Sequence, residues 1–435
     1  MNGMNKDGPQ APAKKPADWQ AAGVDPDEAV QLLRGVVDTP SPTGHEETLA
    51  RFILGWCRER GLHARLQPLG PGRANVIAQL DGAGGGPSLL LDGHMDTSYT
   101  GEEDYLTGIG YKPRAVTRDG WLFGLGAVNM KSGLAAALMT LWTLARGGDR
   151  VPGSLIVAGV AGEIEKACID GYQGAEYTGY GFGTQRLLHH GVCANYAIVC
   201  EPTDFMPSHG QLGTLWVKVT VYGDMRHTAF FNDRTGDHAI YSASRVVAAI
   251  REWGLGYHDR NAYEGQPTCV HVGAIDGGWP WRISRTPQSC ALYVDVRMNP
   301  KQRPEAVLRE FTEVVKSALP DNRTGRLVEI DPYVIVPSVV ARGDELVFQA
   351  LGAAHERVFG RQPTLLFRGP MADSGHLNAA GIPTATYGLG PAGNFDAVNP
   401  ETGEVGEQIR IDDYLKLIGI YINTARQICG KEKGK

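Results

Sequence analysis

Hydrophobic residues recur at two different spacings through the first two hundred residues. Helical spacing or a run of small apolar residues marks three segments, at 25–37, 46–60 and 133–146. Short apolar runs, typical of buried strands, mark four more, at 75–80, 88–91, 154–160 and 196–200. Strands that alternate with helices predict an α/β fold, in which helices cover both faces of the sheet.

The pattern changes between about residues 215 and 330. Residues 215–223 (LWVKVTVYG) alternate apolar and polar side chains, as a half-exposed strand does. A helix at 238–253, a strand at 290–298 and a helix at 304–319 follow. The order strand–helix–strand–strand–helix–strand predicts a small inserted α+β sandwich. We therefore predict a catalytic domain of residues 25–211 and 331–435, with a mixed, helix-covered sheet, interrupted by an inserted lid or dimerisation domain of residues 212–330.

Composition and charge narrow the class of protein. A chain of 435 residues predicts two domains, and the net charge of −6 gives no basic surface for nucleic acid or an anionic membrane. No stretch reaches the length of a transmembrane helix. The first residues lack the apolar core of a secretory signal, so residues 1–24 are predicted to be a disordered leader. Seven scattered cysteines without a CxxC pair favour a reducing cytoplasm.

Polar residues that could perform chemistry follow the predicted strands. His94 and Asp96 form an HxD motif after one strand, Glu163 lies in GEIE after the next, and Glu201 begins EPTD after a third. A glycine-rich segment, GLGAVNMKSG at 124–133, lies between them and lacks the spacing of a phosphate loop. A hydrolase that uses a metal needs imidazole and carboxylate ligands and a separate carboxylate to move protons. One such motif alone would be weak evidence, but four in this order predict a metal-dependent hydrolase.

These motifs resemble those of a known family. With the segments GDMRHTAFF and RTGDHAI, the DVR strand and the late MADSGHLNAAGIPTATYGLGP, they resemble the co-catalytic metallopeptidases. That family includes carboxypeptidase G, acetylornithine deacetylase, succinyl-diaminopimelate desuccinylase and aminoacylase. The resemblance runs from about residue 25 to the C-terminus. It is specific for the family and leaves the substrate open.

The resemblance implies roles for the motif residues. His94 would be a metal ligand and Asp96 the carboxylate that orients it, as such outer carboxylates do. Glu201 would be a second ligand of the same metal. Glu163 would be the general base that moves the proton during attack on the substrate.

Three departures from the family pattern concern its second metal. Asn129 stands where the family has a bridging aspartate, and Ile164 stands where it has a glutamate ligand. The last ligand histidine is missing, because no histidine follows His376. Isoleucine cannot bind a metal, and asparagine offers only a neutral oxygen. We therefore expect one divalent ion per chain, Mn²⁺, Zn²⁺ or Co²⁺, held by His94, Asn129 and Glu201.

Two other carboxylates are alternatives for a lost ligand. Glu165 follows the proposed base closely, and Asp396 lies in the late loop.

The resemblance also implies residues that contact the substrate. His227 matches a lid histidine that reaches the active site of a partner subunit and stabilises the oxyanion, which predicts a homodimer. Arg297 matches an arginine that receives a substrate carboxylate, and His238 stands where the family commonly has asparagine. An exposed hairpin histidine and a surface ion pair are the alternative interpretations of His227 and Arg297.

The segment between Glu165 and Tyr196 is rich in tyrosine and glycine. Its aromatic residues could line a substrate pocket beside the metal, and an ordinary surface loop is the alternative. Tyr172 and Tyr180 are our candidate substrate-binding residues in this segment, which also contains Tyr177 and Phe182.

The predicted function is hydrolysis of a C–N bond in a small, carboxylate-bearing substrate. One form is amide hydrolysis of an N-acyl amino acid or a short peptide. The other is hydrolytic deamination of an aromatic amino acid, as in the family's divergent 5-nitroanthranilate aminohydrolase branch. A catalytically inactive binding or regulatory protein is the alternative from another class. Retention of Glu163 favours an enzyme, because a binding protein needs no proton shuttle.

Overall fold

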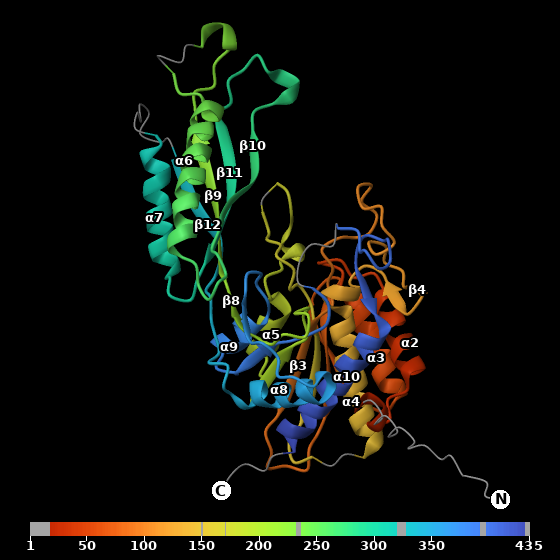
Figure 1. Ribbon diagram of the computed structural model, residues 1–435. Helices are drawn as coiled ribbons and strands as arrows, with labels where there is room; N and C mark the ends of the chain where they lie inside the picture. The colour runs from red at the N-terminus through yellow and green to blue at the C-terminus, as the bar shows by residue number, and fades with distance from the viewer. Residues whose placement is uncertain are drawn as a thin grey trace, which may run out of the picture.

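The chain forms two sheets of different size (Figure 1). The computed structural model describes residues 18–148, 151–169, 171–231, 236–319, 328–391 and 397–430. A large mixed sheet carries most of the helices, and a four-stranded sheet with two helices stands at one end of it (Figure 1). The predicted fold class is confirmed: an α/β catalytic part is interrupted by an inserted α+β sandwich.

The large sheet has eight strands, and its central strands set the position of the polar motifs. Strand β3 lies between β6 and β7 and runs parallel to both. The carboxyl ends of these three strands therefore meet at one edge of the sheet, where open α/β sheets bind ligands. In order across the sheet, the strands are β1 (His63–Gly70), β2 (Arg73–Leu80), β6 (Leu155–Val160), β3 (Leu89–His94), β7 (Tyr196–Val199), β14 (Thr384–Thr386), β8 (Ser208–Gln211) and β13 (Leu366–Arg368).

Helices cover both faces of this sheet because its central strands are apolar on both sides. Leu89 and Leu91 of β3 belong to the larger core, and Leu90 between them belongs to the core on the opposite face. The larger core is closed by α2 (Pro26–Val37), α3 (Glu47–Glu59), α4 (Ser132–Gly147), α8 (Leu346–Phe359) and α10 (Ile411–Cys429). The other is closed by α5 (Phe182–His189) and α9 (Ser374–Ala379).

Smaller elements complete the catalytic part. A three-stranded sheet consists of β15 (Gln408–Arg410), β5 (Trp121–Phe123) and β4 (Val116–Arg118). Two short helical turns are η1 (Ala127–Lys131), which precedes α4, and η2 (Ala175–Tyr177). The first of these turns carries Asn129.

The end of the predicted leader is structured. Residues 1–17 lie outside the described residues, but α1 (Asp18–Ala21) packs against α10. The Asp18 carboxylate accepts hydrogen bonds from Arg357 and Asn423, each at 3.1 Å. The prediction of a disordered leader as far as residue 24 is therefore wrong for residues 18–24, because these contacts fix that segment to the C-terminal helix.

The inserted domain, residues 213–336, has the predicted order of strands and helices. It contains β9 (Gly213–Tyr222), η3 (Thr228–Phe230), α6 (Ala239–Arg260), β10 (Val270–Gly277), η4 (Pro280–Arg282), β11 (Ser289–Met298), α7 (Pro304–Ser317) and β12 (Val328–Val336). The strands lie in the order β10-β11-β9-β12 and pair antiparallel. Alternate residues of β9, from Leu215 to Val221, are buried with side chains of α6 and α7. Strand β12 pairs with β9 as far as Val336, beyond the predicted boundary of 330.

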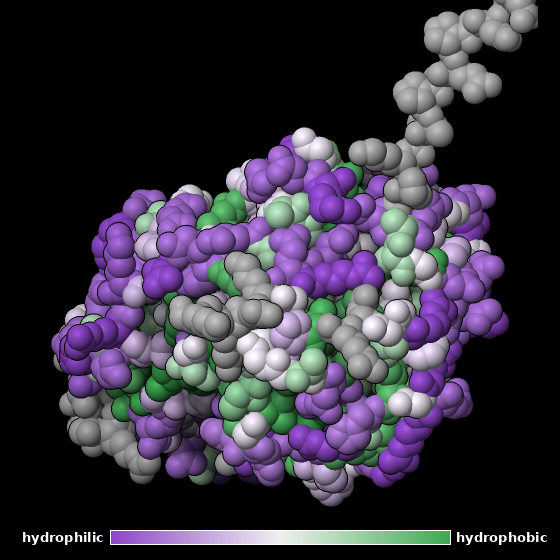
Figure 2. All heavy atoms as spheres, turned by 90° about the horizontal axis from the view of Figure 1, so that it is seen from below, coloured by the Kyte–Doolittle hydropathy of each residue, from purple (hydrophilic) through white to green (hydrophobic). Residues whose placement is uncertain are grey.

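Figure 2 shows the face of the catalytic part that lies away from the inserted domain. Hydrophilic residues cover most of it, with apolar groups scattered between them, as on an ordinary surface in contact with water. Among the described residues, no helix has both the length and the apolar character needed to cross a membrane.

A substitution at the start of α4 tests how closely this helix packs against the end of β7. A Cβ added to Gly133 would lie 2.0 Å from the carbonyl oxygen of Cys200, whereas one added to Gly55 of α3 would meet nothing within 4 Å. We expect Gly133→Ala to lower the free energy of unfolding by about 1–3 kcal/mol through overpacking. The matched control, Gly55→Ala, should raise it by up to about 1 kcal/mol through helix propensity. Urea unfolding measures both, and equal stabilisation by the two substitutions would contradict the close approach.

Candidate active site

A cavity of about 700 Å³ opens at the carboxyl ends of the central strands, between the large sheet and the inserted domain. Charged and polar groups from both parts line it. They include Asn129, Glu163, Glu165, Lys166 and Glu201 from the catalytic part, with Gln266 and Arg297 from the inserted domain and Arg368 from β13. Ile164 also lines the cavity, so the residue that replaces a family ligand presents an apolar side chain there.

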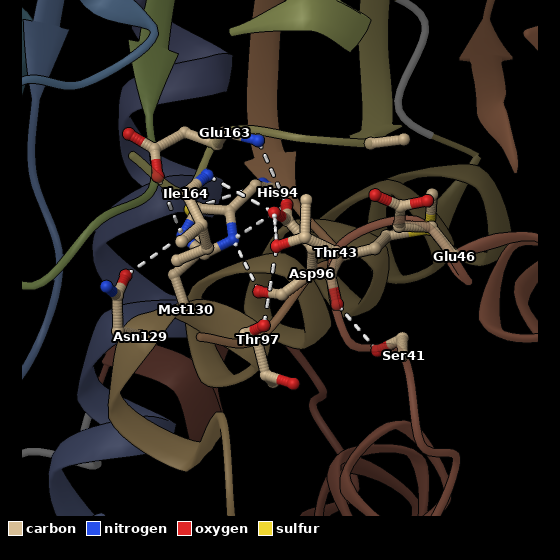
Figure 3. Close-up of polar contacts among 12 residues, drawn as sticks. Ser41, Thr43, Glu46, His94, Asp96, Thr97, Asn129, Met130, Glu163 and Ile164 are labelled. Atoms are coloured by element: carbon tan, nitrogen blue, oxygen red, sulfur yellow. Dashed lines mark hydrogen bonds and ion pairs between the residues drawn. The ribbon is translucent and has the colours of Figure 1, made fainter. Parts of the chain in front are cut away.

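His94 lies at the centre of the polar groups (Figure 3). It ends β3 and is fully buried, and its Nε2 lies 2.9 Å from Oδ1 of Asn129 and 3.7 Å from Oε2 of Glu163. Ligand atoms of His94, Glu163 and Glu201 all lie within 4.8 Å of one another. An imidazole, carboxylates and an amide oxygen suit a divalent ion such as Zn²⁺, Mn²⁺ or Co²⁺. Of the predicted ligands, the structure therefore brings His94, Asn129 and Glu201 into one region.

The negative charges around Glu163 are also those expected at a site that binds a cation. Burial raises the pKa of its carboxyl well above the usual value, and the neighbouring charges of Glu201, Asp373 and Asp96 raise it further. Several acidic groups thus lie close together in largely buried positions. A divalent ion among them would favour their ionised forms.

Asp96 acts on this region through two different groups. Nδ1 of His94 lies 2.9 Å from the backbone oxygen of Asp96, but 3.6 Å from its carboxylate. The carboxylate accepts hydrogen bonds from the backbone N–H groups of Glu163 (3.0 Å) and Ile164 (3.2 Å) and from the Thr43 hydroxyl (2.9 Å). The Asp96 carboxylate therefore mainly holds the segment that carries Glu163, whereas the sequence predicted that it orients His94.

Glu407 positions Asn129 and was not found from the sequence. Its buried carboxylate accepts hydrogen bonds from the backbone N–H groups of Gly126, Val128 and Asn129, each at 2.9 Å. Burial raises the pKa of Glu407, and these donors oppose that rise. No local signal marks this residue, because its partner Gly126 lies 281 positions earlier.

Arg368 is the second residue that the sequence did not reveal. Its Nη1 donates a hydrogen bond to Oε2 of Glu201 at 2.6 Å, and both side chains are buried. The residue ends β13, and its partner lies 167 positions earlier in the chain. An arginine therefore fixes one oxygen of a predicted metal ligand.

Arg297 and Glu165 bind each other across the cavity. Arg297, on β11 of the inserted domain, donates to the two oxygens of Glu165 at 2.7 and 2.5 Å, and its Nε donates to Asp295 at 2.9 Å. Glu165, considered as a replacement metal ligand, is engaged by this arginine instead. The other alternative, Asp396, lies outside the described residues.

The aromatic residues expected beside the metal lie elsewhere. Tyr180 packs edge-on against Trp216 at 5.0 Å between ring centres, and Tyr172 packs against Tyr293 at 6.2 Å. Neither lines the cavity. The expected placement of Tyr172 and Tyr180 is therefore corrected: their rings cover the face of the inserted sheet that α6 and α7 leave open.

The other two aromatic residues of this segment also find partners outside the cavity. Tyr177 packs edge-on against His45, and the Phe182 ring lies 4.8 Å from the Arg73 guanidinium.

His227 and His238 lie near the start of α6, at the end of the inserted domain farthest from the cavity (Figure 1). The exposed His227 accepts a hydrogen bond from the backbone of Ala229 at 3.2 Å. His238 accepts one from the backbone of Tyr241 at 3.4 Å and stacks on its ring. Neither histidine reaches the cavity of its own chain.

The arrangement of strand-end ligands and inserted domain agrees with a match to known proteins. The model of peptidase family M20/M25/M40 matches residues 90–427 of the chain. The chain belongs to this family. As a member of the M20 family it is a metal-dependent hydrolase of C–N bonds, and the sequence-based recognition of the family is confirmed.

Relatives in the M20 family cover nearly all of the chain. It is 24% identical over 439 residues to N-formyl-4-amino-5-aminomethyl-2-methylpyrimidine deformylase of Bacillus subtilis, which covers 94% of this chain and 96% of the relative. It is 23% identical to succinyl-diaminopimelate desuccinylase of Wolbachia pipientis, with 91% and 92% covered. A dinuclear metal-binding M20 peptidase of Bacillus subtilis has a similar fold, with a TM-score of 0.62, 15% identity, and 93% and 98% covered.

Glu407 gives a test of how Asn129 is positioned. In Glu407→Gln, an amide N–H₂ replaces one oxygen and opposes a backbone N–H group. We expect the free energy of unfolding to fall by about 1–3 kcal/mol, and metal affinity to fall by roughly 10–100-fold, as for other residues behind a metal ligand. The control is Glu401→Gln, a surface glutamate paired with Arg410, which should change neither. Unchanged metal affinity in Glu407→Gln would show that this carboxylate does not position the site.

Proposed function

We propose that this M20 hydrolase cleaves the amide bond of a small, carboxylate-bearing substrate, an N-acyl amino acid or a short peptide. The observation that carries the proposal is the meeting of His94, Glu163 and Glu201 within 4.8 Å at the base of the cavity. These residues provide two metal ligands and a separate carboxylate to move protons, as amide hydrolysis at a metal requires.

The site holds one Mn²⁺, Zn²⁺ or Co²⁺ ion in this proposal, bound by His94, Glu201 and Asn129. Two contacts support a single ion: Ile164 presents an apolar side chain to the cavity, and both oxygens of Glu165 are bound by Arg297. The ion would supply Lewis acidity, which polarises the scissile carbonyl and makes a water molecule easier to deprotonate.

Glu163 is the proton shuttle in this proposal, and Glu201 is the ligand. Arg368 fixes one oxygen of Glu201, whereas Glu163 has no arginine or lysine partner in the described part of the chain. Its carboxylate is therefore free to take a proton from the attacking water and to deliver it to the leaving nitrogen. Burial raises the pKa of its carboxyl above the usual value, which favours uptake of a proton during the reaction.

The amide reaction is favoured over deamination of an aromatic amino acid such as a nitroanthranilate. The hypothesis of deamination was based on a rebuilt metal site and on an aromatic loop beside the metal. Tyr172 and Tyr180 of that loop do not line the cavity, although Tyr99 from another segment does. The relatives are, by name, a deformylase and a desuccinylase, which remove acyl groups. An inactive binding protein would need none of the arrangement around Glu163.

The active form is a homodimer in this proposal. His227 is exposed and does not line the cavity of its own chain, so a catalytic role would require the cavity of a second chain. There it would donate a hydrogen bond to the developing oxyanion, a contribution worth roughly 10²–10³-fold in rate.

Glu163→Gln tests the proton shuttle. The amide keeps the shape of the side chain but cannot accept a proton, so turnover of N-acyl amino acids should fall by roughly 10²–10⁴-fold. Metal content should remain that of the wild type. Glu201→Gln is the comparison, because weakening a ligand should lower metal occupancy first. Normal turnover by metal-loaded Glu163→Gln would rule out this mechanism.

Mixing two inactive variants tests whether His227 acts across subunits. His227→Ala and Glu163→Gln are unfolded together and refolded as a mixture. Half of the dimers then combine one chain of each kind, and one of their two sites has both residues intact. Activity should recover to about a quarter of the wild-type value. No recovery, or a fully active monomer in sedimentation, would disprove action in trans.

A further inference from the structure

We propose that Glu165 is a built-in competitor of the substrate: its carboxylate occupies Arg297 in the free protein and is exchanged for a carboxylate of the substrate. The proposal rests on the proposed function and deepens it, because it names a residue that sets how tightly a carboxylate-bearing ligand binds. That Arg297 receives a carboxylate is the expectation from the family resemblance. The new element is the role of Glu165.

Both members of the pair are accessible from the cavity. Glu165 lines it from the catalytic part, and Arg297 lines it from the inserted domain. The two terminal nitrogens of Arg297 donate to the two oxygens of Glu165 at 2.7 and 2.5 Å. This is the bidentate geometry in which a guanidinium binds carboxylates in general. Glu165 therefore presents to Arg297 the same chemical group as the substrate of the proposed function.

Arg297 is held in place independently of Glu165. Its Nε donates to the Asp295 carboxylate at 2.9 Å, so a residue of its own strand supplies one counter-charge. Its backbone N–H donates to the backbone oxygen of Cys269 at 2.8 Å, and its carbonyl oxygen accepts a hydrogen bond from the Tyr257 hydroxyl at 3.1 Å. Its side chain is only 12% exposed. The guanidinium is thus preorganised to receive a different carboxylate.

Glu165, in contrast, is held mainly by the arginine. It lies after β6 in a segment without helix or strand, and 30% of its side chain is exposed. Among the described residues, the other donor to its carboxylate is the backbone N–H of Met371, at the longer distance of 3.4 Å. Rotation about its side-chain bonds moves the carboxylate towards water and leaves the backbone where it is. An exchange of carboxylates therefore displaces the glutamate and not the arginine.

The cost of displacing Glu165 depends on the ligand. A ligand uses Arg297 only in the fraction of molecules whose Glu165 is released, so its apparent affinity is lowered by that fraction. A carboxylate then restores the paired, charge-assisted hydrogen bonds, whereas a neutral amide offers one uncharged acceptor oxygen. Glu165 thus weakens the binding of carboxylates and keeps neutral groups away from this arginine.

Calorimetric titration of two matched probes tests the proposal. N-acetylglycine carries a carboxylate, and N-acetylglycinamide is its neutral counterpart. Both are titrated into metal-loaded, full-length protein that carries Glu163→Gln, in which turnover should not interfere. Adding Glu165→Gln should tighten the binding of N-acetylglycine by roughly tenfold, the usual contribution of a hydrogen bond to a charged group. The affinity for N-acetylglycinamide should change by less than about twofold.

Glu165→Asp separates release of the arginine from removal of a charge. Aspartate keeps the negative charge, but its side chain is one methylene shorter and is expected to lose the paired contact with Arg297. N-acetylglycine should therefore still bind more tightly than to the parent protein. If charge alone were responsible, the affinity would remain that of the parent. This substitution also keeps the test valid if Glu165→Gln does not fold.

Arg297→Gln and Lys166→Met locate the effect, each with and without Glu165→Gln. The gain in affinity for N-acetylglycine should disappear with Arg297→Gln. It should persist with Lys166→Met, because that lysine is a cation that lines the same cavity without binding Glu165 in the proposal.

The proposal is overturned if Glu165→Gln leaves the binding of N-acetylglycine undetected, unchanged or weaker. It is also overturned if the gain is absent from Glu165→Asp, survives Arg297→Gln or is lost with Lys166→Met.

Turnover, measured separately on wild-type protein, distinguishes this proposal from the proposed function. If N-acyl amino acids are not hydrolysed but the gain in affinity depends on Arg297, the proposed function fails and the exchange of carboxylates stands. If they are hydrolysed and Glu165→Gln does not tighten binding, the role of Glu165 alone fails.

Discussion

The burial of several carboxylates at the ends of three neighbouring strands is the constraint on which this site depends. Glu163 and Glu201 follow β6 and β7, Asp96 follows β3, and all three are buried. An unpaired charge in such a place is strongly unfavourable. Asp92, inside β3, shows the effect, because burial, together with the charge of Glu201, raises its pKa to about 7.

The protein balances this charge by three different means. Backbone N–H groups bind the Asp96 carboxylate, and the Arg368 guanidinium binds Glu201. A divalent ion between His94 and Glu201 would be the third, and it would also perform the chemistry. The Arg368 guanidinium beside Glu201 already supplies one positive charge to the acidic region. Less positive charge is therefore needed from metal ions, which agrees with one ion rather than two.

The inserted domain contributes to the same balance. The ion pair between Arg297 and Glu165 joins β11 to the catalytic part and closes one wall of the cavity. Its side chains are only partly exposed, so solvent screens the pair less than it would screen one at the surface. This pair and the ion pair of His209 with Glu264 therefore link the position of the inserted domain to the catalytic part.

The sequence predicted most of what is local and missed what joins distant segments. Apolar runs located the central strands, and the residues directly after them located His94, Glu163 and Glu201. Glu407 and Arg368 could not be found in this way, because their partners lie 281 and 167 positions away. The misplacement of Tyr172 has a different origin: an aromatic side chain in a loop can pack on any open apolar face, and composition does not say which.

The number of metal ions per chain tests the central claim most directly. Purified protein, equilibrated with Mn²⁺ or Zn²⁺ and freed of excess metal, would be analysed for its elements, and anomalous scattering from its crystals would locate the ions. The account predicts one ion per chain, between His94 and Glu201. Two ions per chain, or a single ion elsewhere, would contradict it.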